Sequence, residues 1–78
     1  MLTLYYRAGC SLCEAMLEEL QPFLAGQQAQ LNLVDIDSSA ELVQQFGERV
    51  PVLRGEGGVE ICHYFLDPGR LRDYLASC

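Results

Sequence analysis

The hydrophobic and polar positions of this chain alternate between the period of a strand and the period of a helix. Residues 2–6 are apolar, aromatic or β-branched and end at Arg7-Ala8-Gly9, which predicts a short buried strand followed by a turn. From residue 11 to residue 24, apolar side chains recur at helical spacing, with glutamates on the other side. Pro22 falls inside this pattern, so we expect it to kink the helix or to end it early.

The middle of the chain predicts a second strand and a second helix. Residues 31–36 alternate well enough for a strand. Ser38-Ser39-Ala40-Glu41 matches a capping box, in which a serine and a glutamate three residues later satisfy free N–H groups at a helix start. We therefore expect a helix to begin here and to end at Gly47 as its C′ residue.

The last third of the chain predicts two strands and a helix. Residues 50–53 and 59–65 have the composition of strands, and the short glycine-rich loop 54–58 between them favours an antiparallel hairpin. Asp67 suits an N-cap and Pro68 suits the first helical position, so a last helix is expected to follow them.

These segments give the order β-α-β-α-β-β-α in a single domain over residues 1–78. The first two strands flank a helix, so we expect them to be parallel and joined by a right-handed crossover. The predicted fold is therefore α/β, with a four-stranded mixed sheet and three helices.

The charge and the apolar runs of the chain narrow the classes of function. Eleven acidic residues stand against five arginines, which gives a net charge of −6. Nucleic acids and anionic membrane surfaces need clustered cations, so neither is an expected partner. Residues 1–7 lack the basic start and long apolar run of a signal peptide, so none is expected. No apolar run approaches the ~20 residues that a membrane span requires. A cytoplasmic protein is expected.

Cys10-Ser11-Leu12-Cys13 lies where the first predicted strand ends and the first predicted helix begins. Residues three apart at a helix start face the same side, so the two sulfurs can meet and form a disulfide. Cys10 lies beside free N–H groups and the positive end of the helix dipole, which favour a thiolate, and Arg7 is close enough in sequence to add a positive charge. Cys13 is on the apolar face and is expected to be more buried. We therefore predict that Cys10 attacks a substrate disulfide and that Cys13 resolves the mixed disulfide.

The other two cysteines are assigned no catalytic role. Cys62 and His63 could complete a zinc site with the C-x-x-C pair, but adjacent strand residues point to opposite faces, so both cannot easily reach one ion. We interpret Cys62 as a small buried hydrophobic residue and Cys78 as part of a frayed terminus. No metal ligand is assigned.

Pro51 follows Val50 at the start of the third predicted strand, a position where a missing N–H group is tolerated. In this topology the loop lies near the start of the first helix. A cis Val50-Pro51 peptide is a hypothesis, since it would leave the backbone groups of Val50 free to pair with an extended substrate. Val50 and Pro51 are therefore candidate substrate-binding residues.

Two segments resemble those of glutaredoxins. The stretch Arg7-Ala8-Gly9-Cys10-Ser11-Leu12-Cys13 is similar to the family's basic residue three positions before a C-x-x-C motif. The stretch Arg49-Val50-Pro51 is similar to its Thr-Val-Pro segment, with arginine in place of threonine. The element order is also similar over nearly the whole chain. The resemblance implies a thioredoxin fold, disulfide exchange at Cys10 and glutathione as a candidate co-substrate. No tightly bound cofactor is expected.

By match to the family's glutathione contacts, the resemblance implies that Arg7, Val50 and Asp67 bind the substrate. Ser11-Leu12 stands where the family usually has Pro-Tyr, and its usual Gly-Gly-Cys-Asp-Asp segment is absent, which leaves Leu66-Asp67-Pro68 nearby. The chain is therefore most similar to compact glutaredoxin-like proteins of uncertain physiological role.

The predicted function is thiol–disulfide exchange in cell redox homeostasis, with disulfide-bonded or glutathionylated proteins or small molecules as partners. A rival hypothesis keeps the fold and makes the protein a zinc or iron–sulfur carrier, or a binding module without catalysis. Metal analysis of the anaerobically purified protein separates the two hypotheses.

Overall fold

The structure is a computed structural model that describes residues 1–25 and 30–76. Its elements follow the predicted order, with two additional 3₁₀ turns, η1 and η2. They are β1 (Leu2–Tyr6), α1 (Ser11–Leu24), β2 (Leu31–Asp35), η1 (Ile36–Ser38), α2 (Ala40–Phe46), β3 (Val52–Arg54), η2 (Glu56–Gly58), β4 (Glu60–His63) and α3 (Pro68–Ala76). Among the described residues, no helix is long and apolar enough to cross a bilayer.

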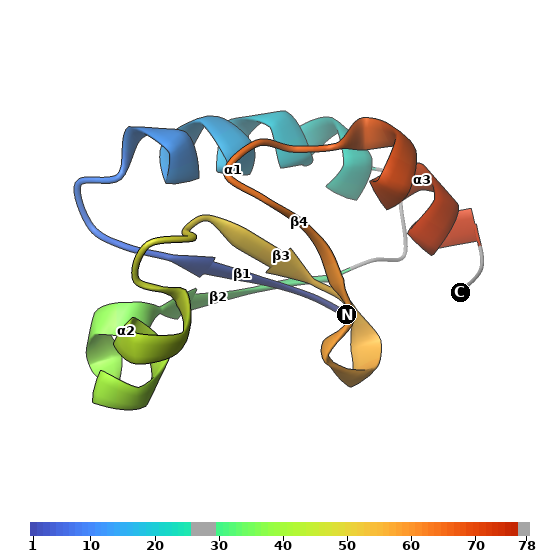
Figure 1. Cartoon of the computed structure of the whole chain (residues 1–78). Coiled ribbons are helices and arrows are strands. Elements are labelled where there is room, and N and C mark those ends of the chain that lie inside the picture. Colours follow the sequence, from blue (N-terminus) through green and yellow to red (C-terminus); the bar gives the residue numbers. More distant parts are fainter. Residues whose placement is uncertain (26–29, 77–78) are drawn as a thin grey trace.

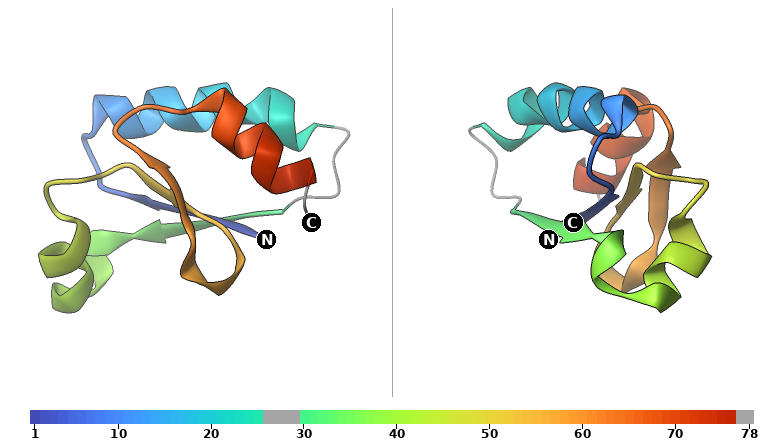
Figure 2. Two further views of the ribbon diagram at one scale, coloured as in Figure 1. Left: turned by 45° about the vertical axis from the view of Figure 1, so that its right-hand side comes forward. Right: turned by 90° about the vertical axis from the view of Figure 1, so that its left-hand side faces the viewer.

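The four strands form one mixed sheet in the order β2-β1-β3-β4. β1 and β2 are parallel, whereas β3 runs antiparallel to both β1 and β4. Helices α1 and α3 cover one face of this sheet, and α2 lies on the other face at one end (Figure 1). The two turned views agree with this layering (Figure 2). The predicted α/β architecture is confirmed, and it is that of a thioredoxin-like fold.

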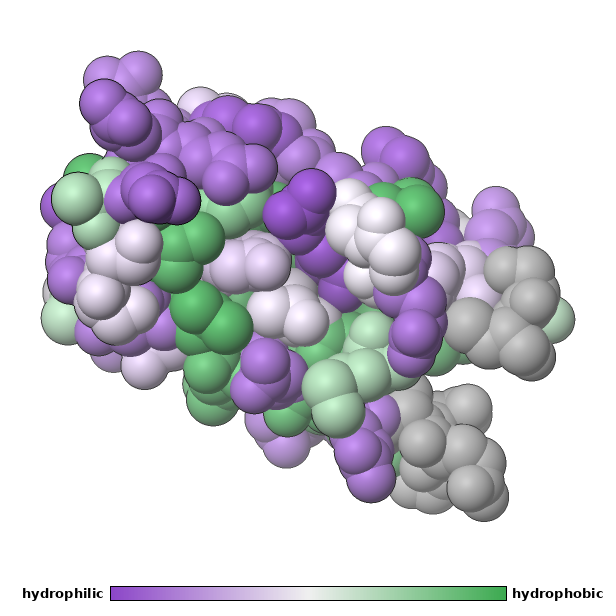
Figure 3. Space-filling model, turned by 90° about the horizontal axis from the view of Figure 1, so that it is seen from below, coloured by the Kyte–Doolittle hydropathy of each residue, from purple (hydrophilic) through white to green (hydrophobic). Residues whose placement is uncertain are grey.

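The alternation of the strands divides the core into two clusters. On the side of α1 and α3, the buried members are Leu2, Leu4, Met16, Leu20, Leu53, Ile61, Cys62 and Leu71. On the side of α2 they are Ile36, Phe46 and Val52. The ring of Tyr5 stacks on that of Phe46, with centroids 4.5 Å apart. Figure 3 shows the molecule from the α2 side, where hydrophobic residues (green) adjoin one another in the middle of the view and hydrophilic residues (purple) lie mostly around them.

The predicted capping box at residues 38–41 is wrong. Ser38 lies in η1, and its hydroxyl donates to the Asp35 carbonyl at 2.6 Å. The Asp35 side chain caps η1 by accepting from the Asp37 N–H group at 2.9 Å. This tight turn delays the start of α2 by one residue, so that Ser39 takes the N-cap position, where no side-chain capping bond is found among the described residues.

Gly47 also differs from its predicted role. It ends α2 with right-handed angles, φ −52° and ψ −35°, instead of the left-handed conformation of a C′ glycine. The Phe46 carbonyl accepts from both Arg49 and Val50, so the backbone continues to turn beyond the helix.

Helix α1 does not end early at Pro22. It continues to Leu24, and the Ala25 N–H group donates to the Gln21 carbonyl at 2.9 Å. Pro22 lies in the last turn, where a missing N–H group removes only one intrahelical bond and the apolar face still packs on the sheet.

Candidate redox site

The N-terminus of α1 presents Cys10 at the end of a tight turn from β1. Gly9 has a φ of +76°, a left-handed conformation that glycine adopts without a Cβ clash. Cys10 is then the N-cap of α1, and its sulfur accepts a hydrogen bond from the Cys13 N–H group at 3.1 Å. A helix start offers free N–H groups and a positive dipole end, and both stabilise negative charge on this sulfur.

Cys10 and Cys13 are joined by a disulfide, with their Cα atoms 5.2 Å apart. Cys13 lies on the inner face of α1 and is only 4% exposed, whereas Cys10 is partly exposed. The two cysteines therefore have the unequal exposure that the sequence predicts. The catalytic roles of both residues stay predictions.

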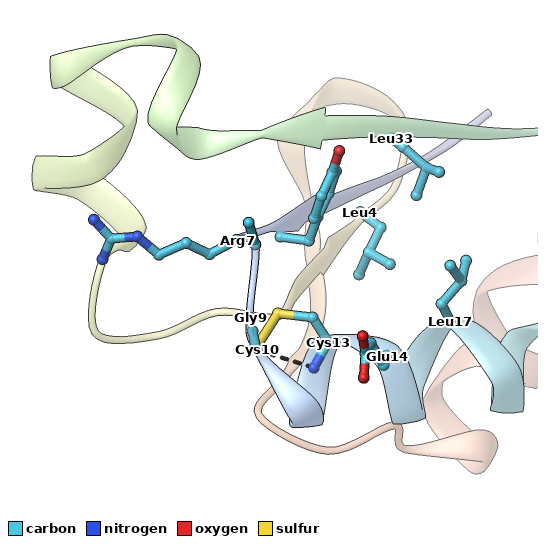
Figure 4. A pocket seen from close by; sticks show the side chains of 10 residues that line it. Leu4, Arg7, Gly9, Cys10, Cys13, Glu14, Leu17 and Leu33 are labelled. Atoms are coloured by element: carbon cyan, nitrogen blue, oxygen red, sulfur yellow. Dashed lines mark hydrogen bonds between the residues drawn. A yellow bond between two sulfur atoms is a disulfide. The ribbon is translucent and has the colours of Figure 1, made fainter.

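Arg7 does not point toward the sulfurs. Its guanidinium group contacts the Asp37 carboxylate, with Nε 3.1 Å from Oδ1 and Nη2 3.0 Å from the same oxygen. Figure 4 shows the side chain extending away from Cys10. The positive charge of Arg7 is therefore not beside Cys10 as predicted, because the Arg7 guanidinium binds a carboxylate thirty residues along the chain.

The Val50-Pro51 peptide bond is cis, as hypothesised. The Pro51 carbonyl accepts from the Tyr64 N–H group at 2.9 Å. The expectation that the backbone groups of Val50 are free is wrong for the N–H group, which donates to the Phe46 carbonyl at 3.1 Å. Substrate binding by Val50 and Pro51 stays a prediction, and it can use the Val50 N–H group only if that bond breaks.

Asp67 is the N-cap of α3, as predicted. Its Oδ1 atom accepts from the Arg70 N–H group at 3.1 Å, and its carbonyl accepts from the Leu71 N–H group at 3.1 Å. This local role accounts for the residue type, and the predicted contact of Asp67 with substrate stays a prediction.

The structure contains an ionic cluster next to the cis-proline loop that the sequence analysis did not predict. Arg49 forms an ion pair with Glu60, and the other carboxylate oxygen of Glu60 lies 2.9 Å from His63 Nδ1. Partial burial raises the pKa of Glu60, but the hydrogen bonds from His63 and Arg49 together outweigh it, and the pKa falls below its ordinary value. In a regular strand, residues three apart point to opposite faces, so the sequence gives no signal for the pair of Glu60 and His63. The register of β3 and β4 shifts between Leu53 and Arg54, and this irregularity accompanies the contact. Nothing in the sequence indicates Arg49 as a partner either.

Cys62 is a free, buried thiol in the core and His63 is exposed, so the prediction that they point to opposite faces is confirmed. Burial raises the pKa of the Cys62 thiol. Within residues 1–25 and 30–76, no group of three or more His, Cys, Asp or Glu side chains is arranged to hold a metal ion. Cys78, predicted to be frayed, lies outside the described residues.

Two hollows adjoin the site. A half-open cavity of about 170 Å³ lies beside the disulfide, between α1 and the strands β1 and β2 (Figure 4). Its lining residues are Leu4, Tyr6, Arg7, Ala8, Gly9, Cys10, Cys13, Glu14, Leu17 and Leu33. A wider, more polar hollow of about 550 Å³ brings Arg7 and Arg49 together with residues of α2 and the turn that follows it.

The family described as "Glutaredoxin-like domain (DUF836)" matches residues 1–76. The chain belongs to this family. No curated protein matches the chain at a significant level. The family and the fold show a redox-related type of domain that carries a C-x-x-C pair, and they name no substrate.

Solved structures extend this likeness over the whole domain. Protein XcR50 from X. campestris is 40% identical with a TM-score of 0.79, and the match covers 100% of this chain and 99% of that one. Protein Ne2328 from Nitrosomonas europaea is 36% identical with a TM-score of 0.82, covering 94% and 87% of the two chains. A malarial protein at 15% identity and a TM-score of 0.65, covering 97% and 92%, is similar in fold alone.

Proposed function

We propose that this glutaredoxin-like domain is a thiol–disulfide oxidoreductase in which Cys10 attacks and Cys13 resolves. The observation that carries the proposal is the disulfide between a partly exposed cysteine at the α1 N-terminus and a buried cysteine one turn later. A substrate in solution reaches the first sulfur far more easily than the second, which sets the order of attack.

The reaction moves two electrons from the protein to its substrate. The Cys10 thiolate attacks one sulfur of a substrate disulfide, so that this bond breaks, a substrate thiolate leaves and takes a proton from water, and a mixed disulfide forms on Cys10. The Cys13 thiolate then attacks the Cys10 sulfur and releases the second substrate thiolate. This step forms the Cys10–Cys13 disulfide that the structure contains.

The start of α1 supports both roles of the Cys10 sulfur. A thiolate there accepts the Cys13 N–H bond and lies at the positive end of the helix dipole. The same interactions stabilise the Cys10 sulfur as the leaving group when a reductant reopens the disulfide.

We further propose glutathione as the reductant that returns the protein to the dithiol form. The polar hollow between Arg7 and Arg49 supports this choice, because guanidinium groups bind carboxylates. Each guanidinium has five N–H donors, so an arginine that is paired with Asp37 or with Glu60 can still donate to a ligand.

The test measures reduction of a glutathionylated peptide, with glutathione or dithiothreitol as the electron source. All variants carry Cys78→Ser, so that this thiol does not contribute. We expect Cys10→Ser to reduce the rate to that of the reaction without protein, whereas the matched Cys62→Ser control keeps the parental rate. Parental turnover in Cys10→Ser contradicts the proposal. Zinc or iron bound stoichiometrically by the anaerobically purified parent, and lost in Cys10→Ser, favours the metal-carrier hypothesis instead.

A further inference from the structure

The half-open cavity beside the disulfide has no role in the exchange steps described above. Its deepest residues, Leu4 and Cys13, are 1% and 4% exposed, and Leu17 and Leu33 line its sides. In Figure 4, Leu4, Leu17 and Leu33 point toward the same space between α1 and the strands. The wall of this cavity is therefore largely apolar.

The cavity lies at the edge of the sheet, where Leu33 of β2 is only partly covered. β2 is an edge strand, and the parallel register pairs Leu33 with Leu4, so both side chains lie on the α1 face. Leu31, two residues earlier, packs against the core, whereas Leu33 remains 48% exposed. An apolar side chain next to the redox site is thus left open to a ligand.

The size and the charge of the cavity limit what it can hold. Its volume of about 170 Å³ is close to the ~150 Å³ of an apolar cavity that binds benzene, and well below the roughly 300–1,000 Å³ of pockets for whole ligands. Glu14 contributes a carboxylate to the lining, and the cation of Arg7 is bound by Asp37. A single neutral apolar group fits these properties, and an anionic group does not.

Cys10 itself lines the cavity, so any group bonded to its sulfur starts at the edge of this space. Such a tether raises the effective concentration of the group far above that of a free ligand. We propose that the cavity receives a neutral aliphatic or aromatic group carried by the disulfide partner of Cys10, so that apolar partners react in preference to polar ones. This inference rests on the proposed function, because the partner arrives through attack by Cys10.

The experiment uses reduced protein with Cys13→Ser and Cys78→Ser, in which Cys10 forms stable mixed disulfides. The probes are two 2-pyridyl disulfides, one carrying a benzyl group and one carrying a 2-hydroxyethyl group. The Cys10 thiolate attacks the sulfur that carries the benzyl or hydroxyethyl group, the disulfide bond to the pyridyl sulfur breaks, and pyridine-2-thiolate leaves and is protonated by water to the absorbing thione. The rate ratio of benzyl to hydroxyethyl probe is divided by the same ratio for free 2-mercaptoethanol, which removes the intrinsic reactivity of the probes.

We expect a corrected ratio of roughly tenfold in favour of the benzyl probe, the discrimination typical of one apolar group in a pocket. Leu33→Trp fills the cavity and is expected to bring the ratio close to one. Val59→Trp, at a residue that is 57% exposed and outside the lining, is the matched control and keeps the tenfold ratio. In the benzyl adduct of the unfilled protein, ¹⁵N chemical-shift changes are expected at Leu17 and Leu33.

Each outcome has a distinct meaning. A corrected ratio near one without Leu33→Trp, or an equal loss in Val59→Trp, overturns the cavity inference. Release of the thione from neither probe overturns the proposed function itself. If Leu33→Trp does not fold, the chemical shifts of the benzyl adduct decide, and unchanged signals at Leu17 and Leu33 overturn the inference.

Discussion

Cys13 and Cys62 are almost equally buried, at 4% and 7% exposure, yet Cys13 is half of a disulfide and Cys62 is a free thiol. Cys13 is one helical turn from a partly exposed cysteine at a helix start. Cys62 lies on β4 opposite Leu53, within the apolar cluster beneath α1 and α3. The two regions give the same side chain different chemistry because of what surrounds it.

Burial alone therefore does not decide whether a cysteine of this protein forms a disulfide. Burial raises the pKa of the Cys62 thiol and so disfavours the thiolate that reacts. At the α1 N-terminus, the Cys13 N–H group and the helix dipole favour a thiolate on Cys10, the disulfide partner of Cys13. Three substitutions test how far the contrast between the two regions holds, and they follow in order of expected effect.

The largest effect is expected from Cys13→Ser. Without the Cys13 sulfur, no thiol of the protein is placed to resolve the mixed disulfide on Cys10. Turnover of a disulfide substrate that is reduced through both cysteines is therefore expected to fall by at least about 100-fold. Mass spectrometry of the acid-quenched reaction measures the adduct, with Cys62→Ser as the control that does not accumulate it. An unchanged rate with no adduct would mean that Cys13 is only a packing residue.

Cys62→Ser is expected to change stability without changing exchange. A serine hydroxyl at this buried position gives up its hydrogen bonds to water on folding. The free energy of unfolding is therefore expected to fall by about 1–3 kcal/mol. Urea denaturation measures the loss, and the exchange rate of the folded variant is expected to stay within about twofold of the parent, because Cys62 is not among the residues that line the redox cavity. A large loss of the exchange rate in folded Cys62→Ser would show that Cys62 also takes part in exchange, which contradicts the prediction.

The smallest effect is expected from Glu60→Gln, which removes the ionic cluster between the cis-proline loop and the strand that carries Cys62. The pKa of Glu60 is lowered in the folded protein from its usual 4.5, so its carboxylate stabilises the fold above that pH. This contribution is lost as the pH falls through the lower folded pKa. We expect a loss of less than about 1 kcal/mol at pH 7.

The loss from Glu60→Gln is expected to disappear in strongly acidic solution, where the parental carboxyl is also neutral. Urea denaturation at both pH values measures this change. Glu18→Gln removes one carboxylate on the exposed side of α1, away from the ionic cluster, and serves as the matched control. A deficit that persists unchanged in acid would show that the Glu60→Gln substitution disturbs packing and not charge.

Some features of the site depend on neighbours along the chain, and the sequence alone determined them. The C-x-x-C pair at a helix start, the glycine that turns β1 into α1, and the Asp67 cap of α3 each need only a few consecutive residues. The parallel pairing of β1 and β2 followed from the same patterns, because a helix between two strands favours a parallel crossover.

The tertiary structure decided which partner each polar group finds. Arg7 pairs with Asp37, thirty residues along the chain, and Arg49 pairs with Glu60 on another element. The cavity beside the disulfide likewise forms only where residues of β1, α1 and β2 come together. Hydrophobic period specifies which face of an element is buried, but it does not specify which distant side chain lies opposite. Pairings of that kind arise only when the packed elements fix the distances between them.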